Sequence, residues 1–236
     1  MLDVITYENW SEEKFKEVSQ NNKDYFDILK WAYNTYSTED IVYACSFGAE
    51  GVVLTDLIYK VKKEARIIFL DTGLHFKETY ELIEKMKQRY PTLIIELKKP
   101  SISLDQQSRE YGEELWRTNP NLCCQIRKIE PLKEALAGTR AWISGLRREQ
   151  GPTRVKTEYI NKDEKFKNIK ICPLIHWTWE DIWNYIRLNH LPYNELHDQQ
   201  YPSIGCEPCT KQVLNGDLRS GRWVNSDKIE CGIHVQ

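Results

Sequence analysis

The chain has 236 residues, of which 41% are hydrophobic, and this is enough for one large domain with a buried core, expected over residues 1–236. The formal net charge of −2 excludes a global basic field of the kind that binds nucleic acid non-specifically. No apolar run approaches the roughly 18 residues of a membrane span and Met1 to Trp10 lack a signal-peptide pattern, so we expect a cytoplasmic protein without a membrane or nucleic-acid partner.

Secondary-structure patterns predict an α/β fold. Residues 11–36 predict two helices, the first capped by Ser11, and residues 1–36 are expected to form an N-terminal helical cover. Strands are predicted at 41–45, 66–70, 92–97, 141–145 and 169–172, and helices around 49–57, around 82–86 and at 178–189. This alternation predicts a mostly parallel sheet flanked by helices. Irregular structure is expected at 98–125, at 147–166 and in a mobile tail over 215–236.

Two loops follow the first two predicted strands, where open parallel sheets bind their ligands. The first is Ser46-Phe47-Gly48-Ala49-Glu50-Gly51, which offers backbone N–H groups at a helix N-terminus to an anion. It is neither a Walker A loop nor a GxGxxG fingerprint, and an ordinary strand–helix turn explains it equally well. The second is Asp71-Thr72-Gly73, whose side chains suit a ribose or an adenine edge, again with a simple turn as the alternative.

Arginines add positive charge near the same sheet edge. Arg147 lies two residues after Gly145 in the loop 144–154, which follows another predicted strand, and Arg219 and Arg222 flank Ser220-Gly221 before the tail. The planar fork of arginine donors matches phosphate or sulfate oxygens. A solvated charged loop is the alternative for the residues around Arg147.

Cysteines are the strongest chemical signal in the chain, which has seven of them. Cys45 and Cys172 lie in apolar runs and are interpreted as buried small hydrophobes. A second group can supply four thiolates to zinc or to an iron–sulfur cluster, namely Cys123 and Cys124, which are adjacent, and the CxxC pair Cys206 and Cys209. Adjacent ligands are unusual for structural zinc and require a distorted backbone, which favours a cluster, but spacing alone leaves the metal open.

Charged residues and a last cysteine complete the pattern. Arg127 and Lys128 directly follow the cysteine pair, where a cation would stabilise a negatively charged cluster or contact a substrate anion. Cys231 lies in the tail, and Lys128 or the two tail arginines would lower the pKa of its thiol and so activate it as a nucleophile. His234 could assist it or bind substrate. From the residues alone, a spare thiol is the competing interpretation of Cys231.

Taken together, these motifs resemble the assimilatory adenylyl-sulfate/phosphoadenylyl-sulfate reductase family. The matching stretches run from about residue 40 to the end of the chain. They are Ser46-Phe47-Gly48-Ala49-Glu50, Leu70-Asp71-Thr72-Gly73, Cys123-Cys124-Gln125-Ile126-Arg127-Lys128, Ser144-Gly145-Leu146-Arg147-Arg148, Cys206-Glu207-Pro208-Cys209-Thr210, Arg219-Ser220-Gly221-Arg222-Trp223 and Glu230-Cys231-Gly232-Ile233-His234.

The resemblance implies an adenine-nucleotide α-hydrolase-like fold and a [4Fe-4S] cluster on the four paired cysteines, which characterise the adenylyl-sulfate branch of the family. It also implies a thioredoxin-dependent oxidoreductase of sulfate assimilation and cysteine biosynthesis. In this mechanism Cys231 attacks the substrate sulfur, AMP leaves, and thioredoxin or glutaredoxin releases sulfite from the S-sulfocysteine. The substrate-binding residues it implies are Ser46, Phe47, Gly48, Ala49, Glu50, Asp71, Thr72, Gly73, Lys128, Gly145, Arg147, Arg219, Arg222 and His234.

Two alternatives remain at this point. An ATP-pyrophosphatase-type tRNA thiolation enzyme would need an SGGxDS loop and a basic surface, and residues 46–50 and the net charge count against it. A non-catalytic, zinc-stabilised nucleotide-binding module would leave the Glu-Cys-Gly-Ile-His tail unexplained. The sequence does not decide between adenylyl sulfate and its 3′-phosphorylated form, nor whether the chain forms a homo-oligomer.

Overall fold

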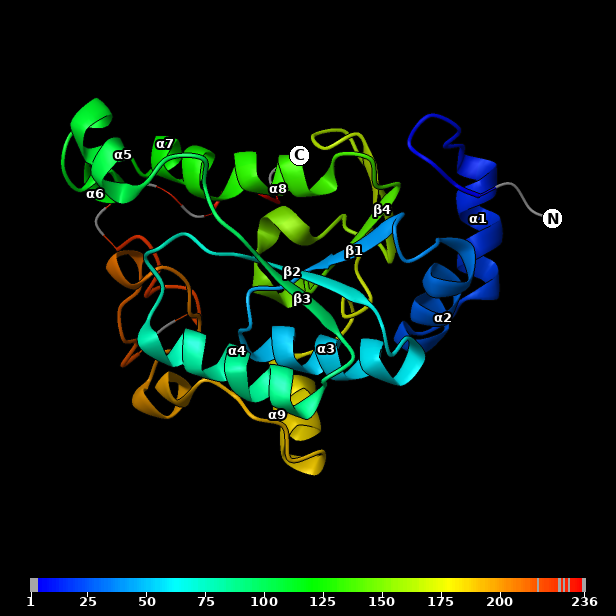
Figure 1. Ribbon diagram of the computed structural model, residues 1–236. Coiled ribbons are helices and arrows are strands. Elements are labelled where there is room, and N and C mark those ends of the chain that lie inside the picture. The colour runs from blue at the N-terminus through cyan, green and yellow to red at the C-terminus, as the bar shows by residue number, and fades with distance from the viewer. Residues whose placement is uncertain (1–3, 216, 225, 227, 229, 235–236) are drawn as a thin grey trace.

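A six-stranded sheet forms the middle layer of the structure (Figure 1). A computed structural model describes residues 4–215, 217–224, 226, 228 and 230–234, so the remaining parts of the predicted N-terminal cover and of the predicted tail lie outside the described residues. The strand order is β3-β2-β1-β4-β6-β5, with bounds β1 Ile41–Ala44, β2 Arg66–Leu70, β3 Ile94–Lys98, β4 Ala141–Ser144, β5 Ile160–Asp163 and β6 Asn168–Ile171. All neighbours are parallel except the β5–β6 pair, which confirms the predicted α/β fold with a mostly parallel sheet.

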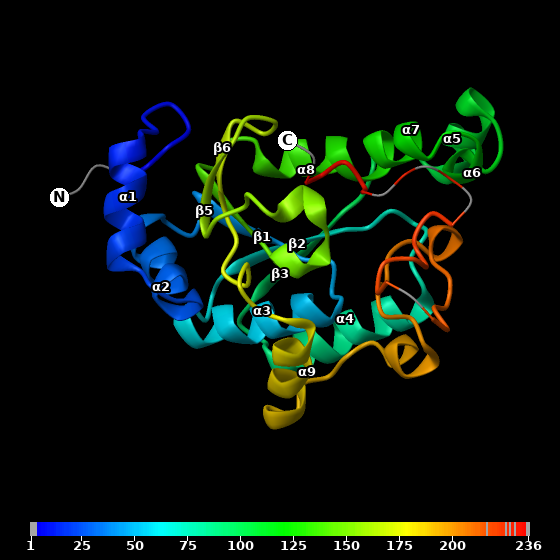
Figure 2. The ribbon, with the colours of Figure 1, turned by 180° about the vertical axis from the view of Figure 1, so that it is seen from behind.

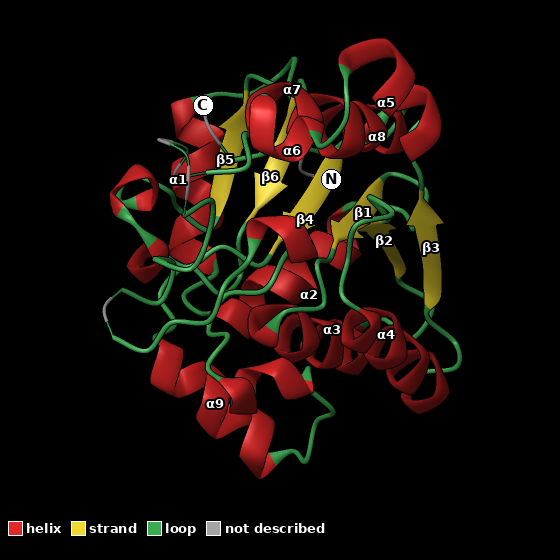
Figure 3. Ribbon diagram, turned by 90° about the vertical axis from the view of Figure 1, so that its left-hand side faces the viewer, coloured by secondary structure: helices red, strands yellow, loops and turns green. Residues whose placement is uncertain are grey.

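The central strands are buried on both faces, which explains their continuous apolar sequences. Successive residues of a strand point to opposite faces. Val42, Ile68 and Trp142 pack with α8 (Glu130–Leu136), whereas their neighbours along each strand belong to the larger core on the other face. Figure 3 shows helices on both sides of the sheet.

The larger core is covered by α2 (Tyr25–Thr35), α3 (Ala49–Val61), α4 (Lys77–Arg89) and α9 (Trp179–Leu188). The prediction of two helices within residues 11–36 is confirmed, since α1 (Glu12–Asn21) begins after Ser11, whose side chain accepts a hydrogen bond from the Lys14 N–H. In Figures 1 and 2 these first two helices lie beyond the amino ends of the strands, the orange segment after about residue 200 lies at the opposite edge, and the last described residues run back to α8. None of the helices in the described part of the chain is long and apolar enough to cross a membrane.

The expectation of irregular structure at 98–125 is wrong. That stretch contains α5 (Leu104–Tyr111), α6 (Leu115–Thr118) and α7 (Pro120–Cys124). These helices are short and largely polar, so they show no apolar stripe, but local caps start them: Ser103 and Gln106 form a capping box, and Asn119 caps α7. The expectation at 147–166 is wrong in part, because β5 pairs there with β6 and two 3-10 turns, Arg148–Gln150 and Pro152–Arg154, precede it.

Candidate functional site

A cavity of about 450 Å³ opens at the carboxyl ends of β1 and β4. These two strands are adjacent in the sheet. The chain continues from β1 to β2 on one side of the pair and from β4 to β5 and β6 on the other side, so the loops that leave β1 and β4 diverge. Open α/β sheets bind ligands at such a switch point. The cavity wall includes eleven of the predicted site residues: Ser46, Gly48, Ala49, Glu50, Lys128, Gly145, Arg147, Arg219, Arg222, Cys231 and His234.

The side chain of Phe47 belongs to the core rather than to the cavity wall. It is 1% exposed and its ring lies 5.9 Å from that of Phe69. Its backbone adopts the left-handed conformation, with φ 51°, which is costly for a non-glycine residue and is often found at functional turns. The turn therefore directs the Phe47 ring into the core, while its two neighbours along the chain, Ser46 and Gly48, line the cavity.

The Asp71-Thr72-Gly73 loop is not part of the described cavity wall, and its contact with a nucleotide stays a prediction. Asp71 accepts hydrogen bonds from the Tyr80 hydroxyl at 2.7 Å and from the Gly73 N–H at 3.1 Å. The Thr72 hydroxyl lies 3.3 Å from Cys206 Sγ, and the Thr72 carbonyl accepts from Arg127 Nε at 2.6 Å. The polar groups of the loop are therefore used to join β2 to the cysteine segments.

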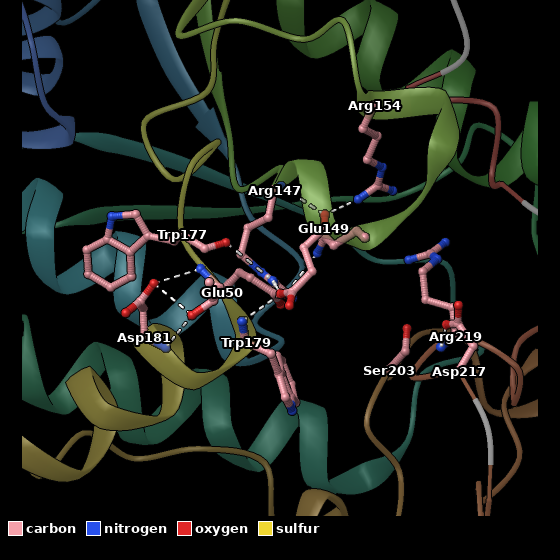
Figure 4. A network of polar contacts seen from close by, with 12 residues as sticks. Glu50, Arg147, Glu149, Arg154, Trp177, Trp179, Asp181, Ser203, Asp217 and Arg219 are labelled. Atoms are coloured by element: carbon pink, nitrogen blue, oxygen red, sulfur yellow. Dashed lines mark hydrogen bonds and ion pairs between the residues drawn. The ribbon is translucent and has the colours of Figure 1, made fainter.

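Arg147 is in the cavity wall, but its charge is already balanced (Figure 4). The side chain is only 2% exposed, and Glu50 Oε1 accepts from its Nη2 at 2.8 Å and from its Nε at 2.9 Å. A second carboxylate, that of Glu149, pairs with Nη1. Two carboxylates on one guanidinium leave no net positive charge for an anion, so this ion-pair network holds the loops after β1 and β4 together.

Arg222 has unused donor capacity. Its Nη1 is 3.4 Å from Ser203 Oγ, and its Nε is buried without a hydrogen-bond partner among the described residues. A buried donor without a partner costs about 1–3 kcal/mol, so this N–H suits an oxygen of a ligand in the cavity. Arg219 also lines the cavity, and its Nη2 lies 3.3 Å from Glu230 Oε1.

The described tail residues 230–234 are docked along the cavity. Cys231 is half-buried in the cavity wall. Gly232 has φ 85°, which favours glycine, and its carbonyl accepts a hydrogen bond from Lys165 Nζ at 2.5 Å. Ile233 packs on the core beneath α8. In Figure 2 this segment runs back beside α8. The fold thereby brings a thiol from the end of the chain to the switch point.

His234 stacks on Trp142, with ring centroids 6.1 Å apart and an angle of 8° between the planes. Its Nδ1 lies 3.2 Å from Lys170 Nζ. Burial, followed by the positive charge of Lys170, holds the pKa of His234 well below its ordinary value. The imidazole is therefore neutral at neutral pH and contributes packing and a hydrogen bond rather than positive charge.

Sequence reasoning did not select Arg154 or Glu230 as site residues, although both line the cavity. Arg154 is 4% exposed, and its Nη2 lies 2.5 Å from Glu230 Oε2. The available signals were the pair Arg147-Arg148 in the same loop as Arg154, and the position of Glu230 directly before Cys231. Nothing in the sequence, however, places Arg154 and Glu230 together.

Lys128 connects the large cavity to a second, smaller one. It lies on the π-helical turn Gln125–Ile129 and lines both cavities. Burial lowers the pKa of Lys128, but negative charge on the thiolates of Cys206, Cys124 and Cys231 outweighs it and holds the pKa above its ordinary value. The side chain is therefore an ammonium group placed between two sets of thiols.

The smaller cavity is lined by all four paired cysteines: Cys123, Cys124, Cys206 and Cys209. The adjacent pair ends α7, and the backbone departs from regular α-helix directly after it, in the π-helical turn. Among the described residues, no three His, Cys, Asp or Glu side chains are grouped as ligands of one metal ion. The thiols instead surround a space.

The four cysteines around this cavity need positive charge nearby if all of them are to bind a ligand as thiolates. Burial and then the neighbouring thiols raise the pKa of Cys123 to about 12 and that of Cys209 to about 11. Burial also opposes ionisation of Cys206, but Lys128 and other nearby donors outweigh it and hold the pKa of Cys206 below its ordinary value. Four thiolates can share this space only with compensating cations.

The sheet, its switch-point cavity and its helical layers define an adenine-nucleotide α-hydrolase-like fold. Residues 40–212 match the phosphoadenosine phosphosulfate reductase domain, and the chain therefore belongs to that family.

Relatives span the full chain. Adenosine 5′-phosphosulfate reductase 2 of Bacillus subtilis (strain 168) is 61% identical over 237 residues, covering 100% of both chains. Adenosine 5′-phosphosulfate reductase of Geobacillus sp. (strain WCH70) is 60% identical over 235 residues, covering 98% of this chain and 100% of the relative. The crystal structure of phosphoadenylyl-sulfate reductase from Candida auris in a phosphate complex is 31% identical with a TM-score of 0.73, covering 87% of this chain and 98% of that one.

Proposed function

We propose that this protein reduces adenylyl sulfate to sulfite and AMP, as a step of sulfate assimilation toward cysteine in the cytoplasm. The observation that carries the proposal is that the Cys231 thiol lies in the wall of the same switch-point cavity as Lys128, Arg219 and Arg222. Two relatives that are about 60% identical over their whole length are named adenosine 5′-phosphosulfate reductases, and these names support adenylyl sulfate as the substrate. The chain acts as one reductase domain, 1–236, with its catalytic tail over 215–236.

The anionic part of the substrate is bound by backbone and side-chain donors. Gly48 is the N-cap of α3 and has no side chain to cap it, so the first N–H groups of this 13-residue helix are available to a phosphate. Further donors are the ammonium of Lys128 and the Nε–H of Arg222, for which the described part of the chain offers no partner.

In the first step, the Cys231 thiolate attacks the sulfur of adenylyl sulfate. A bond forms between Sγ and that sulfur, and the bond from that sulfur to the bridging oxygen breaks. AMP leaves with the electron pair and Cys231 carries an S-sulfo group. Positive charge at Lys128 and Arg222 stabilises the charge that develops on the leaving phosphate.

In the second step, a dithiol protein of the thioredoxin or glutaredoxin type reduces the adduct. One thiolate of the dithiol attacks Cys231 Sγ and releases sulfite, and the second thiolate breaks the resulting mixed disulfide. The dithiol loses two electrons, the sulfur of sulfate gains them, and Cys231 returns as a thiolate. The tail must open for this attack, because Cys231 is half-buried where it is docked.

The four thiols around the smaller cavity would hold a [4Fe-4S] cluster, which takes four cysteine thiolates. When bound, the cluster ties the two cysteine segments together and sets the electrostatic field next to Lys128. Two cations, the buried Arg127 and the half-buried Lys128, provide the compensating charge that the thiolates require.

The test is mass spectrometry of anaerobically purified protein mixed with adenylyl sulfate and no reductant. We expect a mass gain of one SO3 group on the peptide that contains Cys231, and its release as sulfite when thioredoxin is added. A Cys231→Ser variant should form no adduct and turn over no substrate. Turnover by that variant would refute the nucleophile.

The same measurement separates the alternatives. If the wild-type protein contains iron and sulfide but forms no adduct, the substrate assignment fails, and ATP cleavage to AMP and pyrophosphate with tRNA becomes the next assay. If zinc replaces iron and no sulfite forms, the non-catalytic module is supported instead.

A further inference from the structure

The contacts of Glu230 point to a role that the reaction itself does not assign. Its side chain is 8% exposed, with Oε2 2.5 Å from Arg154 Nη2 and Oε1 3.3 Å from Arg219 Nη2. Oε1 also accepts a hydrogen bond from the Cys231 N–H at 3.2 Å. We propose that Glu230 is a positioning residue, whose carboxylate docks the tail on Arg154 and Arg219 and so holds Cys231 at the cavity. The proposal rests on the proposed role of Cys231.

The two arginines belong to parts of the fold that are distant in sequence. Arg154 ends the 3-10 turn Pro152–Arg154, and Arg219 lies beyond the second cysteine pair. Figure 4 shows both side chains beside the cavity network, reaching from different segments. Glu230 therefore joins the tail to two elements at once, and among the described residues it is the one carboxylate that forms an ion pair with Arg154.

Burial makes this contact stronger than an exposed ion pair. Arg154 is 4% exposed, and a buried guanidinium without a counter-charge is strongly destabilising. Burial of the carboxyl opposes its ionisation, but Arg154 and then Arg219 outweigh it and hold the pKa of Glu230 below its ordinary value. The carboxylate is thus ionised at neutral pH, as the contact requires.

Arg154 can hold Glu230 and a ligand at the same time. Its Nη1 donates to Gln150 Oε1 and its Nη2 to Glu230, while its Nε is buried without a partner among the described residues. The side chain also lines the cavity. Tail docking therefore leaves the Nε–H of this guanidinium for an anion in the cavity.

Within residues 230–234, the contacts other than those of Glu230 lie on the far side of the thiol. Lys165 binds the Gly232 carbonyl, and His234 stacks on Trp142. Glu230 immediately precedes Cys231, so the reactive residue is held from both sides. Loss of the Glu230 contact would free the residue directly before Cys231, and on that side of the thiol it would leave the contact of Lys228, which donates to the Pro120 carbonyl at 3.0 Å and to Asn121 Oδ1 at 2.9 Å.

The test compares wild-type holoenzyme with Glu230→Gln, which keeps the shape and removes the charge. Three quantities are measured: the rate of S-sulfo adduct formation at saturating adenylyl sulfate without reductant, the Kd for AMP, and the rate at which iodoacetamide alkylates Cys231 in the free enzyme. We expect the adduct rate to fall about 10- to 100-fold, the range of a lost hydrogen bond to a charged group. The Kd should change by less than about twofold, and alkylation should become faster.

Two further sets of variants sharpen the result. Asp40→Asn removes the carboxylate of another Arg–carboxylate pair, 3.3 Å from Arg140 Nε at the opposite sheet edge, and should leave all three quantities unchanged. Arg154→Met should slow adduct formation, and combining it with Glu230→Gln should slow it by much less than the product of the two single effects, because the two residues act through one contact.

The outcomes are distinct. An unchanged adduct rate and unchanged alkylation in Glu230→Gln would overturn the proposal. A weaker Kd with an unchanged rate at saturation would also overturn it, because Glu230 would then arrange the ligand site rather than the tail. If the wild type forms no adduct, the proposed function fails, and the alkylation rates still decide whether Glu230 docks the tail.

Discussion

Arg222 can occupy the cavity wall because the residue beside it has no side chain. A Cβ atom on Gly205 would lie 2.2 Å from Arg222 Nη2 and 2.6 Å from its central guanidinium carbon. Since the contact is with the flexible end of a side chain, a larger residue at position 205 would move the guanidinium rather than break the fold.

Gly205→Ala should therefore weaken substrate binding. We expect KM for adenylyl sulfate to rise roughly tenfold, the effect of losing one charged hydrogen bond, while the thermal midpoint stays within about 2 °C. Steady-state kinetics and thermal unfolding measure the two quantities. Ser203→Ala, which removes only a 3.4 Å contact of Arg222, should have a smaller effect. An unaltered KM in Gly205→Ala would show that Arg222 does not bind substrate.

At the scale of elements, one carboxylate connects three helices. Asp56 in α3 accepts hydrogen bonds from Tyr90, at the end of α4, at 2.7 Å and from Tyr185 in α9 at 2.6 Å, and it pairs with Lys60 at 2.8 Å. Burial of the carboxyl raises its pKa, but these donors outweigh burial and leave the pKa of Asp56 below its ordinary value.

Asp56→Asn should lower the free energy of unfolding by about 2 kcal/mol at pH 7, because the charged acceptor is lost. Since folding lowers the pKa of Asp56, its contribution is present above the unfolded pKa of about 3.9 and is lost as pH falls through the folded pKa. Urea unfolding at pH 7 and in acid should show the difference between wild type and variant shrinking in acid. Glu64→Gln, in an exposed pair, should change stability by less than about 0.5 kcal/mol. A difference that grows in acid would contradict this assignment.

Two short helices, α6 and α7, should depend on the proposed [4Fe-4S] cluster, because α7 carries Cys123 and Cys124. α6 and α7 have only 4 and 5 residues, and isolated helices of that length do not form in water. We expect the amides of residues 115–124 to lose hydrogen-exchange protection in cluster-free protein while α9 keeps it. Equal protection of residues 115–124 with and without the cluster would show that packing alone holds this segment.

At the scale of the whole molecule, the elements that the sequence predicts are those whose position is determined by a local pattern of apolar residues. β1, β2 and β4 are buried on both faces, so their apolar runs identified them. β5 reads Ile-Asn-Lys-Asp and is a strand only because β6 pairs with it. The Arg154–Glu230 contact joins residues far apart in the sequence, and the neutralisation of Arg147 depends on Glu50 from another loop. Such pairings are properties of the assembled fold.

The position of the first two helices has a practical consequence for handling the protein. α1 and α2 lie beyond the amino ends of the strands, at the edge opposite the cavity (Figure 1). A purification tag or a surface tether fused ahead of α1 is therefore held away from the substrate and from the incoming dithiol protein. The same fusion placed after the tail would load the segment that has to carry Cys231 in and out.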